Sequence, residues 1–300
     1  DVQDEIVANL PGCERAEILQ HGYAVEYDMV RPHQIHATCE TKSIAGLFLA
    51  GQINGTSGYE EAAGQGLVAG LNAARRARGD DAVTLRRDQA YIGVMMDDLV
   101  TKTPREPYRM FTSRAEHRLI LRSDNAADRL TPLAISWSLT DSARESAHTQ
   151  RTEQLSAVRT AVDSARVGGK PLAKHAKQPG YTPTDFAADL KAHGFDAAQL
   201  SVGVLDTALA ELQYEGYIAR QRAEIKRHAE MERRSIPDAL DPRSITGLRT
   251  EAAEALARFK PDTVGQAARL EGINPADVSV LLIALREAAN LTGTKNGAGG

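Results

Sequence analysis

The residues best suited to bind a cofactor form the glycine-rich stretch GQINGT, which follows a short apolar run. Its polar side chains can reach the ribityl hydroxyls of a flavin, and its glycines let the backbone approach the ligand closely. The N–H groups of a helix beginning directly afterwards would face oxygens of the ligand. We expect a flavin-binding loop, with a plain glycine-rich connection as the alternative. Its residues are Gly51, Gln52, Ile53, Asn54, Gly55 and Thr56.

A second candidate site is the group of arginines in PYRMFTSRAEHRLILR. Arg114, Arg118 and Arg122 recur every four residues, which predicts one stripe on a helix. With Arg109 just before it and aromatic residues nearby, this stripe suits contact with nucleic-acid phosphates and stacking on bases. The alternative is a solvated face on which the arginines pair with neighbouring carboxylates.

Other candidate residues have simpler explanations. Glu60 and Glu61 would lie in the first turn of a helix, where acidic side chains stabilise the helix dipole. The glycines of GQGLVAG have the wrong spacing for a dinucleotide fingerprint and indicate close helix packing. Cys13 and Cys39 stand in no CxxC pair and near no histidine at ligand spacing, so no metal site is expected.

Two segments of the second half could also bind a partner. A long polar helix is expected over residues 203–234, with 6 Lys or Arg against 3 Asp or Glu between residues 218 and 234. The default interpretation is a solvent-exposed strut, with binding of a partner helix or RNA as the alternative. Residues 263–285 resemble a helix-turn-helix. The second helix of that pair carries mainly core leucines and few basic residues, which argues against groove recognition.

The elements expected to position the glycine loop are a strand before it and a helix after it. Residues 46–50 form a continuous apolar run between glycines, as in a buried central strand, and residues 22–27 alternate as in a half-buried strand. Ser57 and Glu60 stand in the S-x-x-E capping-box pattern, which predicts a helix ending near Gly79. A strand, a glycine loop and a helix in this order form the unit with which α/β proteins hold a cofactor.

The rest of the chain shows mainly helical patterns. A second S-x-x-E pattern at Ser113 and Glu116 predicts a helix through Arg122. Residues 168–183 contain three prolines and three glycines and predict a loop, and the tail from residue 292 predicts a disordered end. Further helices are expected over residues 141–167, 184–193, 203–234, 244–259, 263–271 and 275–290.

Composition limits the classes of protein. The 300 residues suggest about two domains, and 42% hydrophobic and 25% charged residues are ordinary for a globular protein. The net charge of -4 is no general nucleic-acid signature, but residues 1–100 carry 8 Lys or Arg against 15 Asp or Glu, and residues 101–150 carry 8 against 6. No apolar run approaches the roughly 20 residues of a membrane span. The cysteine pattern fits a reducing compartment such as the cytoplasm.

Several segments together resemble the MnmG (GidA) family. Residues 46–74 resemble the last strand and following helix of its flavin domain, and residues 107–132 resemble the signature that follows. YEGYIARQ and KPDTVGQAARLEGINPADVSVLL resemble its C-terminal helical region. The similarity runs from about residue 20 to residue 286 and is loose over residues 150–200.

This resemblance implies an enzyme that adds a carboxymethylaminomethyl-type group to C5 of the wobble uridine of certain tRNAs. It implies FAD as cofactor, with NADH and methylene-tetrahydrofolate as co-substrates. It also implies a cytoplasmic homodimer that acts together with the GTPase MnmE and does not bind a membrane. Residues 51–56 would contact the cofactor. The RNA contacts would be made by Arg109, Arg114, Arg118 and Arg122.

The implied fold is mostly α: a remnant of a doubly wound, Rossmann-like FAD-binding domain of the α/β class, followed by an all-α C-terminal domain. We expect residues 1–90 to be the C-terminal part of the FAD-binding domain. Residues 91–235 would form a helical domain containing the long helix, and residues 236–300 a small C-terminal helical subdomain.

The chain also departs from the family pattern. It begins at Asp1 without Met, and the family's GxGxxG fingerprint, catalytic cysteines and NADH insertion do not occur in it. Cys13 and Cys39 do not stand in the contexts of the family's cysteines, and His117 stands where the family often has tyrosine. We therefore expect a C-terminal fragment that is inactive alone, with its catalytic residues upstream and unknown.

Two alternatives come from other functional classes. A general flavin oxidoreductase would turn over small substrates without any dependence on RNA. A helical module that binds nucleic acid or protein would carry no flavin in the full-length protein. The folate-dependent tRNA uracil methyltransferases share the flavin fold, but they carry a different sequence after the strand and lack this helical C-terminus.

Overall fold

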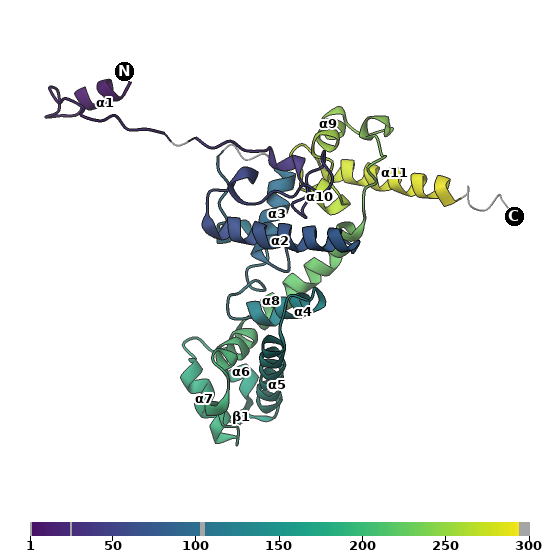
Figure 1. Cartoon of the computed structure of the whole chain (residues 1–300). Coiled ribbons are helices and arrows are strands. Elements are labelled where there is room, and N and C mark those ends of the chain that lie inside the picture. The colour runs from purple at the N-terminus through teal and green to yellow at the C-terminus, as the bar shows by residue number, and fades with distance from the viewer. Residues whose placement is uncertain (1, 25, 103–105, 294–300) are drawn as a thin grey trace.

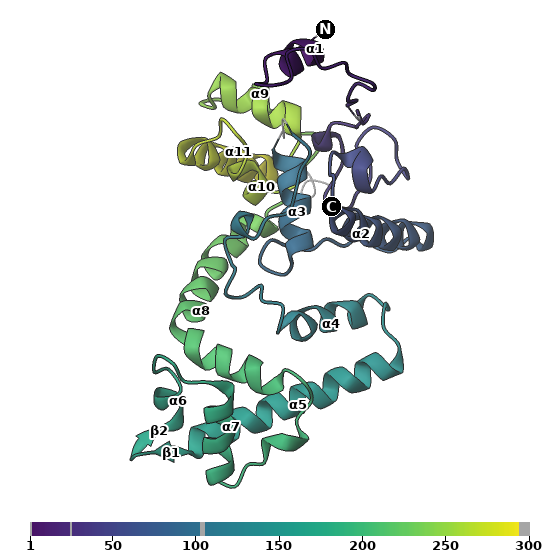
Figure 2. The same cartoon turned by 90° about the vertical axis from the view of Figure 1, so that its left-hand side faces the viewer.

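The computed structural model describes residues 2–24, 26–102 and 106–293, and it confirms a predominantly helical chain. An upper body contains the N-terminal third and the last helices, a lower body contains the middle third, and one long helix joins them (Figures 1 and 2). A short N-terminal arm carrying α1 (Val2–Ala8) projects away from the upper body in Figure 1.

The first core of the upper body is built around α2 (Tyr59–Arg78) and α3 (Tyr91–Thr101). The 3-10 turns η1 (Pro32–Gln34) and η2 (Gly51–Asn54) pack against these helices. Of the glycines in GQGLVAG, only Gly64 shows the expected close helix packing, since an added Cβ would lie 3.2 Å from Ile92, whereas one at Gly66 or Gly70 would meet nothing within 4 Å. The core side chains are Ile35, Cys39, Val68, Ala69, Met95, Met96, Leu99, Val100 and Tyr108.

The two strands predicted near the glycine loop do not form in the described residues. Residues 46–50 contain a single bridge, between Phe48 and Glu40, and residues 22–24, 26 and 27 have no strand. Val25, part of the second predicted strand, lies outside the described residues. An apolar run becomes a central strand only when neighbouring strands accept and donate its backbone hydrogen bonds, and here segment 46–50 has one bridge partner.

Both predicted capping boxes are wrong. The helix α2 forms as expected and ends beside Gly79, but its N-cap is Gly58 rather than Ser57, and no side chain caps it. Near Ser113 the chain forms only the 3-10 turn η3 (Thr112–Arg114), followed by irregular turns. The tertiary cause lies in Ala115 and Leu121, which are buried against Val94 of α3 and draw the backbone away from a regular helix.

In the lower body, α5 (Ser142–Ser164) and α7 (Pro183–Ala192) pack against α8, and α4 (Ala126–Ser136) packs against α5. The predicted loop over residues 168–183 instead contains β2 (Lys170–Pro171), α6 (Leu172–His175) and the start of α7. The strand β2 pairs antiparallel with β1 (Arg166–Val167), which replaces the end of the helix predicted over residues 141–167. A real capping box, with Thr182 and Asp185, begins α7. The core side chains include Leu155, Val158, Val162, Leu172, Phe186, Leu190, Val204, Ala208 and Leu209.

The long helix α8 (Val204–Arg233) runs from the lower body to the upper body (Figure 2). There it meets a small bundle of α9 (Thr250–Phe259), α10 (Val264–Ala268) and α11 (Pro275–Gly293). The turns η4 (Ala197–Gln199) and η5 (Pro242–Ser244) precede α8 and α9. These helices confirm the expected helical segments, but α9 begins at Thr250 rather than at residue 244, where the chain forms η5. Of the predicted tail, residues 292 and 293 belong to α11, and residues 294–300 lie outside the described part.

Candidate functional site

The glycine loop is organised by a glutamine that the sequence patterns did not single out. Gln65 Oε1 accepts hydrogen bonds from the Gly51 N–H at 3.1 Å and from Asn54 Nδ2 at 2.8 Å. Its Nε2 donates to Thr56 Oγ1 at 2.9 Å. All four residues are buried. A buried amide whose oxygen and nitrogen are both hydrogen-bonded holds the loop in one conformation, because breaking any of these bonds would leave a buried polar group without a partner.

The six predicted cofactor residues are therefore not equivalent. Gly51 and Gly55 have φ values of 83°, which glycine adopts without strain. Asn54 and Thr56 point inward, and Asn54 Oδ1 is buried without a hydrogen-bond partner among the described residues. Gln52 is exposed and donates to the Asp28 carbonyl at 3.1 Å, while Ile53 is half-buried. Gln52 is thus the member of the set whose polar side chain lies at the surface.

The start of α2 is closed by a carboxylate rather than by a cap. A Cβ added to Gly58 would lie 1.7 Å from Glu61 Oε2, so this position accommodates only glycine while Glu61 stays in place. Glu61 is buried, and its Oε1 accepts a hydrogen bond from the Met110 N–H at 2.8 Å. Glu61 therefore ties α2 to the arginine segment, a specific contact beyond its position near the helix dipole.

The arginine segment, residues 107–122, is joined to the glycine loop through its first residues. The Tyr108 N–H donates to the Gly55 carbonyl at 2.7 Å, and Thr56 and Tyr108 form a parallel bridge. The Tyr108 hydroxyl donates to Asp98 at 3.0 Å. Burial and the charge of Asp98 raise the pKa of Tyr108, so the phenol stays protonated. The glycine loop and the arginine segment thus form one connected structure.

The four predicted RNA-binding arginines do not form a helical stripe, because the segment is irregular. The Arg114 guanidinium lies over the Tyr108 ring at 4.6 Å, and its Nε donates to the Arg109 carbonyl at 2.8 Å. Arg109, Arg114 and Arg118 are exposed. Arg122 is different, since its side chain is only 12% exposed and donates two hydrogen bonds to Asp124.

A buried ionic cluster, which we call the Asp97–Asp98 hub, joins the arginine segment to the C-terminal bundle. Arg87 Nη1 contacts Asp98 at 2.8 Å and Asp97 at 3.1 Å, and its other nitrogens bind Glu116. Arg269, just after α10, binds Asp97 at 2.6 Å and also contacts Glu232 of α8. No sequence pattern pointed to this hub, since its members lie far apart along the chain.

Charge pairing controls protonation in the hub. Burial by itself would lower the pKa of Arg87 and of Arg269. The hydrogen bonds and charges of Glu116, Asp97 and Asp98 outweigh burial for Arg87, and those of Asp97 and Glu232 do so for Arg269. Both pKa values therefore lie above their ordinary range, so both guanidinium groups are charged at neutral pH.

Family models match both ends of the chain. The model described as "Glucose inhibited division protein A" matches residues 1–81, and the model described as "tRNA modifying enzyme MnmG/GidA C-terminal helical bundle" matches residues 224–298. The chain belongs to the MnmG/GidA family. These matches and the similar proteins confirm the family assignment and a mostly helical fold, in which a GidA N-terminal region is followed by a C-terminal helical bundle.

Similar proteins cover almost the whole chain. The protein named tRNA uridine 5-carboxymethylaminomethyl modification enzyme MnmG from Streptococcus thermophilus is 44% identical over 301 residues, and its Streptococcus pyogenes counterpart is also 44% identical. The crystal structure of Aquifex aeolicus GidA in form II superposes with a TM-score of 0.79 at 42% identity and covers 95% of this chain. The chain spans 48% of the first relative and 47% of that crystallised chain, about half of each.

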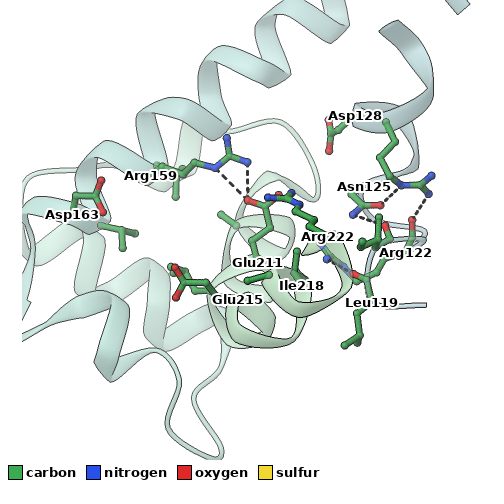
Figure 3. A pocket seen from close by; sticks show the side chains of 17 residues that line it. Leu119, Arg122, Asn125, Asp128, Arg159, Asp163, Glu211, Glu215, Ile218 and Arg222 are labelled. Carbon is green, nitrogen blue, oxygen red and sulfur yellow. Dashed lines mark hydrogen bonds and ion pairs between the residues drawn. The ribbon is translucent and has the colours of Figure 1, made fainter. Parts of the chain in front are cut away.

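A cleft of about 760 Å³ lies beside the end of the arginine segment in this family member. Leu119 and Arg122 line it from the segment, and Ile218 and Arg222 line it from α8 (Figure 3). Its apolar floor includes Val158. Most of its charged groups are already paired; the Arg159 guanidinium, for example, contacts Glu211 at 2.7 Å.

The remaining candidate chemistry is limited. Within the described part of the chain no group of three or more His, Cys, Asp or Glu side chains could hold a metal ion. Cys39 is buried, and burial raises its pKa to about 12, so its thiol is not activated as a nucleophile. Among the helices described, none is long and apolar enough to cross a membrane.

Proposed function

We propose that this chain is the C-terminal part of a flavin-dependent enzyme that modifies C5 of the wobble uridine in tRNA. The added group would be of the carboxymethylaminomethyl type, and the GTPase MnmE would act as partner to a homodimer in the cytoplasm. The observation that carries the proposal is the similarity to MnmG over 95% of the chain at 44% identity. We place the catalytic residues in the part of the parent protein that this chain does not contain.

The glycine loop is proposed to hold FAD mainly through its backbone. Its polar side chains Asn54 and Thr56 are engaged with Gln65, so they shape the loop and leave its outer surface to backbone groups. Gln52 would make the side-chain contact, and the uncapped N–H groups of the first turn of α2 would face oxygens of the ligand. The inward-facing side chains bonded to Gln65 and the exposed Gln52 fit this role.

The bound flavin would supply redox chemistry with NADH as reductant and methylene-tetrahydrofolate as carbon donor. The described residues of this chain position the cofactor and the RNA. Because the glycine loop and Tyr108 share a backbone bridge, RNA held by the arginine segment would be held at a constant distance from the cofactor loop. Arg109, Arg114 and Arg118 would contact phosphates from the surface, and Arg122 would contribute from the cleft wall.

The test uses the full-length parent that contains this chain. We expect a yellow protein whose flavin is reduced by NADH and which, with the GTPase partner, GTP and the folate donor, modifies uridine in a tRNA transcript, as detected by nucleoside mass spectrometry. A flavoprotein that turns over NADH but leaves tRNA unmodified would support a general oxidoreductase. A colourless protein that binds tRNA would support a binding module. Either result would overturn the proposal.

The isolated chain is expected to bind FAD weakly. Its glycine loop offers a few hydrogen bonds worth about 1 kcal/mol each, which does not offset the cost of immobilising a large cofactor. Equilibrium dialysis of the 300-residue chain against FAD measures this. Stoichiometric flavin retained through gel filtration would contradict the expectation.

A further inference from the structure

We propose that the face of α8 from Arg222 to Arg233 is a second RNA-contacting surface, which binds the phosphate backbone of tRNA away from the glycine loop. The inference rests on the proposed function, because it takes tRNA as substrate. It assigns Arg222, Lys226 and Arg233 as cations that hold the RNA. We call these three side chains the α8 cationic face.

The arginine segment ends on α8, and two clefts lie along this contact. Gln221 Nε2 donates to the Glu116 carbonyl at 3.2 Å, which fixes the segment to the helix. The first cleft is the one that Arg122 lines, and the second, of about 600 Å³, is lined by His117 together with the α8 cationic face. Arg222 lines both clefts, so the two lie on either side of this residue.

The charges of the second cleft are not balanced. Its acidic groups are largely engaged, since Glu116 binds Arg87, Glu232 binds Arg269 and Asp88 binds Arg86. Glu224 is the one lining carboxylate without an ion pair in the described structure. Against it stand the three members of the α8 cationic face, all exposed and with no ion pair in the described ranges.

The spacing of these cations fits an extended polyanion. Arg222 and Lys226 are one helical turn apart, and Arg233 lies about 16 Å from Arg222 along the axis, at 1.5 Å per residue. A single small anion cannot neutralise charges spread over that length. A nucleic-acid backbone carries charge continuously and gains affinity by releasing counterions at each contact.

The cationic face also continues an existing series of cations. The arginine segment carries Arg109, Arg114 and Arg118, all of which are exposed. Its last residue, Arg122, lines the first cleft together with Arg222. A solvated strut needs charges of both signs and no preferred side. The three unpaired cations of the α8 cationic face line the second cleft, where they outnumber the one unpaired carboxylate, whereas Arg220 and Arg227, which also have no ion pair within the described residues, line neither cleft. This local excess of positive charge favours RNA binding over a strut.

The experiment compares two double variants of the full-length parent with equal charge change on the same helix. Arg222→Gln with Lys226→Gln alters the α8 cationic face. Arg220→Gln with Arg227→Gln is the matched control, because both residues are exposed and neither lines a cleft. We measure binding of a tRNA transcript at two salt concentrations, association with the GTPase partner, NADH-dependent flavin reduction without tRNA, and the thermal unfolding midpoint.

We expect the cationic-face variant to bind tRNA at least tenfold more weakly and to flatten the log–log salt dependence by somewhat less than two units. The control should stay within twofold of the parent, and the flavin reduction and unfolding midpoint should be unchanged in both. Equal tRNA affinity in the two variants would overturn the inference while leaving the proposed function intact. So would loss of GTPase association with unchanged tRNA binding, which would assign the face to a protein. A parent that binds no tRNA would instead remove the proposed function itself.

Discussion

Arginines stand in two contrasting environments in this molecule. In the Asp97–Asp98 hub, the Arg87 side chain is 12% exposed and is surrounded by three carboxylates. On the surface formed by the arginine segment and α8, Arg118 and Arg222 are exposed and have no ion pair within the described residues. Buried and paired arginines connect helices, whereas exposed and unpaired ones remain free to bind an anion.

The contrast shows that residue type alone does not assign a role. Arg86 and Arg87 are neighbours in sequence, yet Arg86 forms a surface pair with Asp88 while Arg87 lies inside the hub. In the arginine segment, Arg122 resembles the hub more than it resembles Arg118, because Asp124 holds it in the cleft wall. Burial and the partners available decide whether an arginine is structural or binds a ligand.

The largest expected effect is on the hub. Arg87→Ala removes a buried cation that contacts Asp97, Asp98 and Glu116, and leaves Arg269 beside Asp97 and Lys102 beside Asp98. Breaking this buried network should lower the free energy of unfolding by about 3–5 kcal/mol. Arg86→Ala is the control, since its surface pair contributes less than about 1 kcal/mol. Urea unfolding followed by circular dichroism measures both. Similar losses of unfolding free energy for the two variants would mean that the buried hub stabilises the protein no more than a surface ion pair does.

The next effect concerns the interior of the glycine loop. Gln65→Ala removes the partner of the Gly51 N–H, Asn54 and Thr56, and we expect a loss of about 2–4 kcal/mol, since each unmade buried hydrogen bond costs about 1–3 kcal/mol and the site can partly relax. The same urea titration checks it. An unchanged midpoint would show that water replaces the amide without cost.

The surface of the same loop should behave differently. In the full-length parent, Gln52→Ala should weaken FAD binding about fivefold, equivalent to one hydrogen bond of about 1 kcal/mol, and leave stability unchanged because Gln52 is exposed. Flavin release measured by fluorescence tests this. If FAD affinity were unaltered, Gln52 would not contact the cofactor, and the loop would act through its backbone alone.

A smaller effect is expected in acid. Burial would raise the pKa of Glu116, but its hydrogen bond to Arg87 outweighs burial, and the pKa lies below the ordinary 4.5. Its contribution to stability is therefore complete above about pH 4.5 and is lost as the pH falls through the lower, folded-state pKa. Because Glu116 is 45% exposed, solvent screening limits this contribution to less than about 1 kcal/mol. Glu116→Gln should flatten the fall in stability between about pH 5 and pH 3, and an identical acid profile would contradict this assignment.

The smallest effect on stability is expected at Arg118. Arg118→Ala should change the free energy of unfolding by at most about 0.5 kcal/mol. In the full-length parent it should still weaken tRNA binding and flatten the salt dependence by somewhat less than one unit. Titrating one preparation of the variant with tRNA, and separately with the GTPase partner, at two salt concentrations tests this prediction. Unchanged tRNA affinity with loss of the GTPase partner would reassign Arg118 to that protein contact.

The sequence predicted the helical segments better than it predicted the candidate site. Periodicity and glycines located α2, α5, α7 and α8 within a few residues, because those signals act within one or two turns. The four-residue spacing of arginines suggested a helix that does not form, since burial of Ala115 and Leu121 against Val94 outweighs the local pattern. The predicted strand over residues 46–50 failed for a similar reason, as a strand depends on partners elsewhere in the chain.

By itself the sequence determined the family, the positions of the helices and the glycine loop, because each depends on residues close together along the chain or on similarity read directly from it. Only the tertiary structure showed that Gln65 fills the loop, that Arg87 and Arg269 are structural, and that Arg222 stands between two clefts. Arg269 and Asp97 are 172 positions apart, and their pairing arises when the end of α10 packs beside α3. Burial and charge pairing depend on such distant neighbours, so no local pattern contains them.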